Sequence, residues 1–125
     1  MTARQITILT DVELITCIVQ KGWADKIVAA AYEAGAQGAT IHYAQGSGVK
    51  ERLGVFGVAV DSEKEVIYIV VSEEQSNRVF DAVYLAGKLD TPGMGFVYVK
   101  KLEKAATYIP KEVLEKIRKK RGVHV

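Results

Sequence analysis

An internal repeat constrains the fold of this 125-residue chain more than any other feature. Residues 13–20 and residues 65–72 both read as apolar strands, and they lie 52 positions apart. The same offset superposes four of the six residues from position 30 to position 35: Ala30 on Ala82, Tyr32 on Tyr84, Ala34 on Ala86 and Gly35 on Gly87. Because this register holds without a gap from the strand onward, the pattern indicates a duplicated unit.

Each copy of the repeat reads as strand, helix, strand. Residues 23–34 place apolar side chains at helical spacing before Gly35, and residues 38–43 form the next strand. In the second copy Ser72 and Gln75 predict a capping box, residues 95–99 predict the closing strand, and four residues supply the apolar side of the helix: Val79, Phe80, Val83 and Leu85. The predicted fold class is α+β: a ferredoxin-like duplicated β-α-β with an antiparallel four-stranded sheet.

The chain is expected to form one domain over residues 1–125. Repeat 1 covers about 12–44, an interrepeat loop about 45–56, and repeat 2 about 57–99. The C-terminal extension, 100–125, is predicted to hold a short strand within 102–109 and a helix that begins at Pro110. Residues 1–10 are expected to form another edge segment or to be loosely held.

The two strands that open the repeats are apolar on both faces. In the second of them Val66, Tyr68 and Val70 face one way, while three other residues face the opposite way: Ile67, Ile69 and Val71. The two helices can cover only one face of the sheet. We therefore expect a further copy of the chain to cover the other face.

Two glycine-rich loops, residues 45–54 and 87–95, are candidates for binding a small anion. Glycine lets backbone amides approach an anion closely, and Lys50, Arg52 and Lys88 add positive charge. The alternative is that these glycines only allow the chain to turn between strands.

The duplicated core, with Gly87-Lys88 followed by Gly93-Met94-Gly95 and a strand, resembles the PII signal-transduction family from about residue 13 to residue 109. The resemblance implies a homotrimer that binds adenine nucleotides between subunits and docks on a regulated protein, such as a membrane transporter, through its interrepeat loop. It also implies three groups of nucleotide-binding residues: Gly46 and Gly48 at the base of the loop, Gln37 and Val70 beside the adenine, and Gly87, Lys88, Gly93, Met94 and Gly95 on the phosphate side. The partner loop would present Ser47, Val49, Lys50, Glu51 and Arg52.

The sequence departs from the family pattern at three cations. The lysine that the family has after its Gly-x-Gly is Phe96 here, and two phosphate-binding arginines fall on Thr107 and Ile109. Because charge-assisted hydrogen bonds are the strong ones, the remaining groups suit AMP or ADP better than ATP. A different small anion also fits, and no cofactor is expected.

Other classes of function find less support. His42 is read as a half-buried structural residue, Tyr43 as a packing residue at a strand end and Cys17 as a small core residue, so an enzyme is not predicted. Nucleic-acid binding lacks the exposed aromatic residues that stack bases, and no metal motif is present. A single cysteine and an N-terminus without signal-peptide features favour a cytoplasmic protein. A trimeric adaptor without a ligand, or a small-anion or metal-related trimer of the same architecture, remains the alternative.

Overall fold

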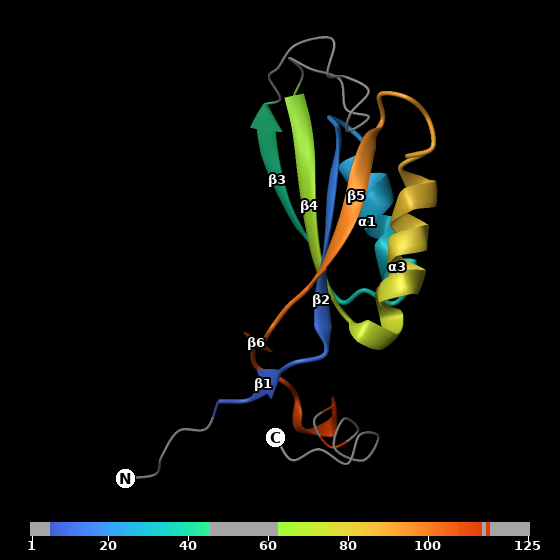
Figure 1. Cartoon of the computed structure of the whole chain (residues 1–125). Coiled ribbons are helices and arrows are strands. Elements are labelled where there is room, and N and C mark those ends of the chain that lie inside the picture. Colours follow the sequence, from blue (N-terminus) through green and yellow to red (C-terminus); the bar gives the residue numbers. More distant parts are fainter. Residues whose placement is uncertain (1–5, 46–62, 114, 116–125) are drawn as a thin grey trace.

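A computed structural model describes residues 6–45, 63–113 and 115 of the chain. Its main feature is an antiparallel sheet of four strands in the order β3-β4-β2-β5, with a separate pair formed by β1 and β6 (Figure 1). The elements run in the chain as β1 (Ile8–Leu9), β2 (Val12–Gln20), α1 (Ala24–Glu33), β3 (Thr40–Gln45), β4 (Glu63–Ser72), α3 (Glu73–Ala86), β5 (Gly95–Lys101) and β6 (Ala105–Ala106). This is the predicted ferredoxin-like duplication, with β2-α1-β3 as one copy and β4-α3-β5 as the other.

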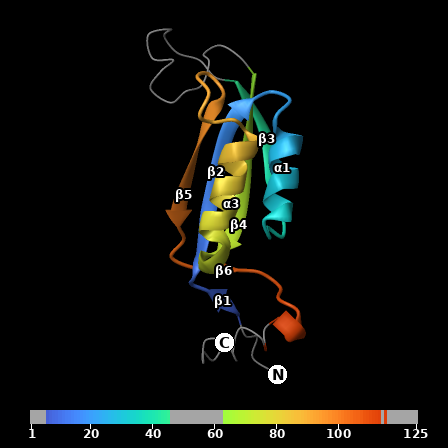
Figure 2. The same cartoon turned by 90° about the vertical axis from the view of Figure 1, so that its right-hand side faces the viewer.

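Both helices lie on the same face of the sheet, where they pack side by side (Figure 2). The core between the layers contains Ile15, Cys17 and Val19 from β2 and their counterparts from β4 and the helices: Ile67, Ile69, Val71, Ile27, Ala31, Val79 and Val83. The predicted division of the two strand faces is therefore confirmed on the covered side. Leu85 is an exception, because it is 70% exposed. It follows the buried Val83 by two residues, which turns it to the far side of the helix.

The free backbone amides at the N-terminal ends of the two helices find hydrogen-bond acceptors in two different ways. At α1 the buried carboxylate of Glu65 accepts hydrogen bonds from the amides of Gly22 and Ala24, at 2.7 and 3.0 Å. At α3 Ser72 does occupy the capping position, but no described side chain makes a capping bond there. The capping box was therefore a wrong prediction. Instead, the amide of Glu73 donates to the backbone carbonyl of Asp11 at 2.9 Å, so a neighbouring segment satisfies the helix end.

The C-terminal ends share one hydrogen-bond pattern but use different residues. After α1, Gly35 adopts a left-handed conformation with φ of 113°, and the amides of residues 35 and 36 bond back to the carbonyls of residues 32 and 31. After α3 the same pattern places Lys88, not Gly87, in the left-handed position with φ of 52°. The second helix therefore continues one residue further than the repeat alignment predicts.

The predicted additions to the duplicated core are both present. Residues 105–106 form β6, which pairs with Ile8–Leu9 of β1, and this pair projects beyond the end of the main sheet (Figure 1). Residues 111–113 and 115 are helical, one residue after the predicted start at Pro110. No helix in the described part of the chain is long and apolar enough to cross a membrane.

Candidate functional site

The loop from residue 87 to residue 94, which joins α3 to β5, is built as a succession of tight turns. The amide of Thr91 donates to the carbonyl of Lys88 at 2.9 Å, and the amide of Met94 donates to the carbonyl of Thr91 at 3.3 Å. The loop lies at the end of the sheet where β2 finishes and β4 begins (Figure 1). We call this end of the molecule the loop end.

Gln20 attaches this loop to the sheet. Its side-chain Nε2 donates to the carbonyl of Gly93 at 2.8 Å, and its Oε1 accepts from Nζ of Lys64 at 3.4 Å. Gln20 is the last residue of β2 and lies opposite Lys64 in the register. Sequence reasoning missed this role, although a glutamine that closes an otherwise apolar strand is the signal that could have indicated it.

The glycines of the loop have backbone and packing reasons for being glycine. Gly95 has φ of 141°, and a Cβ there would lie 2.1 Å from the carbonyl oxygen of Ile18, which leaves no space for any side chain. Gly93 has φ of 82°, which side chains rarely allow. Gly87 is helical, with φ of −82°, and a Cβ would lie 3.1 Å from Leu89 and 3.2 Å from Ile27.

Lys88 is the one residue other than glycine in the described part of the chain with a positive φ. Its ammonium nitrogen lies 5.9 Å from the ring centroid of Trp23, and that of Lys26 lies 5.2 Å from the same ring. Both distances are within the range of cation–π attraction. Neither Trp23 nor Lys26 was among the residues predicted for the site.

An open cavity of about 600 Å³ lies at the same end, between β3 and β4, which falls in the size range of small-ligand sites. Its lining consists of Lys21, Tyr43, Ala44, Gln45, Glu63 and Lys64. Lys21 and Glu63 form an exposed ion pair at 2.8 Å. The hydrogen bond and the charge of Lys21 lower the pKa of Glu63, and the same pair raises the pKa of Lys21. These two charges are therefore already matched to each other.

The structure places Gln37 and Val70 at the opposite end of the sheet. Val70 pairs with Leu14, whereas Gly95 pairs with Val19. The five intervening steps along β2 correspond to roughly 17 Å. Gln37 precedes β3 at the same end of the sheet as Val70, and its Nε2 lies 3.4 Å from the carbonyl oxygen of Gly35. One copy of the chain therefore does not bring the predicted adenine-side and phosphate-side residues together.

The remaining predicted site residues fall outside the described residues. These are Gly46 and Gly48 at the base of the interrepeat loop and the partner-loop residues Ser47, Val49, Lys50, Glu51 and Arg52. Of the three positions where the family has cations, Phe96 stacks on Tyr98 at 5.9 Å, and Thr107 and Ile109 follow β6 beyond the other end of the sheet.

The other candidate groups differ in their surroundings. Cys17 is fully buried, and burial raises the pKa of its thiol from 9.0 to about 12. His42 is exposed and stacks on Tyr68 at 5.7 Å, and Tyr43 is 72% exposed, so the expected burial of these two side chains was wrong. Both belong to the edge strand β3, and His42 pairs with Val66 on the side of the sheet away from the helices. No group of three or more metal-binding side chains occurs among the described residues.

Comparisons with known proteins agree with this architecture. The fold resembles a crystal structure of Arabidopsis thaliana PII bound to citrate, with a TM-score of 0.59 and 17% sequence identity, over 75% of this chain and 79% of that one. At this identity the likeness shows the fold. The sequence also matches the family model of nitrogen regulatory protein P-II over residues 12–112, which is most of its length, and the chain therefore belongs to the P-II family. No curated protein sequence matched the chain significantly.

Proposed function

We propose that the chain is a non-catalytic, cytoplasmic regulator that assembles into a homotrimer and binds an adenine nucleotide, AMP or ADP rather than ATP, in clefts between subunits. Occupancy of the cleft would then control the docking of a regulated protein, such as a membrane transporter, through the loop of residues 45–56. Membership of the P-II family supports the regulatory role, and the geometry of the sheet supports the location of the cleft.

The observation that carries this proposal is the separation of the predicted site residues. Gln37 and Val70 lie at one end of the sheet and the loop of residues 87–94 lies at the other, roughly 17 Å apart along β2. A nucleotide that contacts both groups therefore requires the adenine side of one subunit and the phosphate side of a neighbour.

The open face of the sheet supplies a surface for that neighbour. We define the open face as the side of the sheet away from the helices, which includes Thr16, Ile18, Val66, Tyr68, Val70 and Tyr98. Val70 is 50% exposed and Tyr98 is 44% exposed on this face. Apolar side chains over a sheet face are typical of an interface between proteins. The number of three subunits comes from the family resemblance.

The choice of ligand follows from the cations available on the phosphate side. Lys88 is present, whereas Phe96, Thr107 and Ile109 stand where the family has charge. The similar Arabidopsis PII structure holds citrate, which shows that a related fold accepts a small carboxylate anion. A small polycarboxylate is therefore the ligand to test beside the adenylates.

The test is isothermal titration calorimetry of the full chain with AMP, ADP, ATP, cyclic AMP and citrate, after light scattering has measured its mass. We expect binding of AMP or ADP by a trimer, with the affinity reduced by Lys88→Ala and unchanged by Lys111→Ala. Gly95→Asp is unsuitable as a probe, because its Cβ would collide with the carbonyl of Ile18 and disturb the sheet. A trimer that binds none of these ligands would contradict the sensor and favour the ligand-free adaptor.

A further inference from the structure

Two lysines from distant parts of the sequence each lie over the indole ring of Trp23 at the loop end. Lys26 belongs to the first turn of α1, and Lys88 follows α3. Their ammonium nitrogens lie 5.2 and 5.9 Å from the ring centroid of Trp23. The pairing of α1 with α3 on one face of the sheet brings them together (Figure 2).

These two charges have no acidic partner in the described part of the chain. The ion pairs found there join Lys21 to Glu63 and Lys101 to Glu73, and neither includes Lys26 or Lys88. Asp25 is next to Lys26 in the sequence but is exposed and forms no ion pair with either lysine.

The buried carboxylate nearest to this region is already engaged. Glu65 accepts the amides of Gly22 and Ala24 at the start of α1, so it neutralises the helix end and not the lysines. Two like charges close to one ring repel each other, and a bound anion would relieve that repulsion.

The backbone of Lys88 adds an independent observation. Its φ of 52° belongs to the left-handed region, which costs free energy for any residue with a Cβ. Gly35 forms the equivalent helix end in the first copy without that cost. Strained conformations of this kind cluster at binding sites, and the lysine adds an ammonium group over Trp23 that glycine could not supply.

We infer that Lys26 is a second anion-binding residue beside Lys88, and that the pair binds a phosphate-type dianion next to the indole of Trp23. The inference rests on the proposed function, since it extends the phosphate side of the same site. Lys26 then supplies part of the charge that is absent at Phe96, Thr107 and Ile109. A cation–π contact is weaker than a charge-assisted hydrogen bond, so the two exposed lysines can turn from the indole toward an anion.

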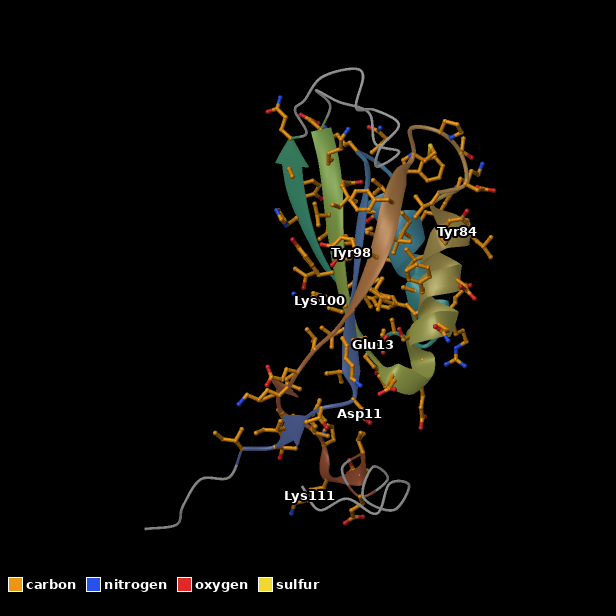
Figure 3. All side chains as sticks on the ribbon, viewed as in Figure 1. Asp11, Glu13, Tyr84, Tyr98, Lys100 and Lys111 are labelled. Atoms are coloured by element: carbon orange, nitrogen blue, oxygen red, sulfur yellow. The ribbon has the colours of Figure 1, made fainter. Side chains whose placement is uncertain are left out.

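Trp23 is the only tryptophan of the chain, so its fluorescence reports directly on this cluster. The experiment titrates the full chain with pyrophosphate and with ADP and follows this fluorescence, with calorimetry as a second readout. Lys26→Met and Lys88→Met each remove one charge and keep an unbranched side chain. Lys111→Met is the matched control, because Lys111 lies at the other end of the molecule (Figure 3). Thermal unfolding followed by circular dichroism checks that each variant folds.

We expect both ligands to change the fluorescence of the native chain and of the control. The dissociation constants should rise roughly three- to tenfold in Lys26→Met and in Lys88→Met. If Lys26→Met binds both ligands as tightly as the native chain, the inference is wrong, whether or not the proposed function holds. A response to pyrophosphate that depends on Lys26, without binding of any adenylate, would keep the inference and overturn the adenylate part of the proposed function. No response to either ligand would contradict both.

Discussion

The two faces of the central sheet have similar residue types but different surroundings. On the covered face, Ile15, Cys17 and Val19 of β2 are completely buried under the two helices. On the open face, Thr16 lies between Tyr68 and Tyr98 in the register, and its buried hydroxyl has no hydrogen-bond partner among the described residues. The covered face is complete within one copy of the chain, whereas Val70 and Tyr98 leave apolar surface on the open face that a second copy can cover.

This difference separates what stabilises the subunit from what assembles it. A charge placed on the covered face should prevent the subunit from folding. A charge on the open face should leave the fold intact and prevent the subunits from associating.

Ile69→Asp is expected to unfold the subunit. Ile69 is fully buried between the sheet and the helices, and an unpaired carboxylate there costs several kcal/mol, a large part of the stability of a small domain. Circular dichroism and urea unfolding measure the effect. A cooperative unfolding transition near that of the native chain would show that the covered face is not the core of the subunit.

Tyr98→Asp is expected to keep the fold and reduce the mass in solution to that of one chain. Position 98 is half exposed on the open face, so the introduced carboxylate stays hydrated in the single subunit but would be desolvated between subunits. Light scattering gives the mass, and Tyr98→Phe is the matched control that should remain assembled. An assembled Tyr98→Asp variant would place the interface elsewhere.

Glu65→Ala is expected to destabilise the subunit by about 1–2 kcal/mol without changing its mass. The substitution leaves the amides of Gly22 and Ala24 without their buried acceptor at the start of α1. Urea unfolding measures the change, and Glu103→Ala, at an exposed position, should have little effect. Equal stability of the two variants would mean that Glu65 does not cap the helix.

Cys17 makes the stability of the covered face depend on pH. Burial raises the pKa of its thiol to about 12 in the folded chain, so the folded state keeps a proton that the unfolded state loses above pH 9. Stability should therefore fall as pH rises above 9, by up to about 1 kcal/mol per pH unit more than in Cys17→Ala. Urea unfolding at pH 8 and pH 10 gives the two slopes. Parallel slopes would indicate that the thiol titrates normally and is not buried in solution.

Much of the fold could be predicted from the sequence because its signals are local. The repeat, the alternation in residues 65–72 and the helical spacing in residues 23–34 each lie within one segment, and the element boundaries agree within about two residues. The prediction that Gly87 ends the second helix is confirmed, since Gly87 is its C-cap residue, although the left-handed position that Gly35 holds in the first copy falls one residue later, at Lys88.

The candidate site was less predictable, because it depends on contacts between distant segments. Gln20 reaches Gly93 across 73 positions, and Trp23 meets Lys88 only because α1 and α3 pack together. Neither contact follows from a motif or a spacing. The resemblance to the PII family indicated the loop of residues 87–95 but not the side chains that surround it.

The proposed function requires that a ligand site is completed between copies of the chain. The most direct test compares calorimetric titrations of ADP into the native assembly and into the folded, separated subunits of Tyr98→Asp. We expect saturable binding by the assembly and no measurable binding by the separated subunits, since Gln37 and Val70 then lie too far from the loop of residues 87–94. Equal affinity in the two preparations would contradict it and place the whole site within one chain.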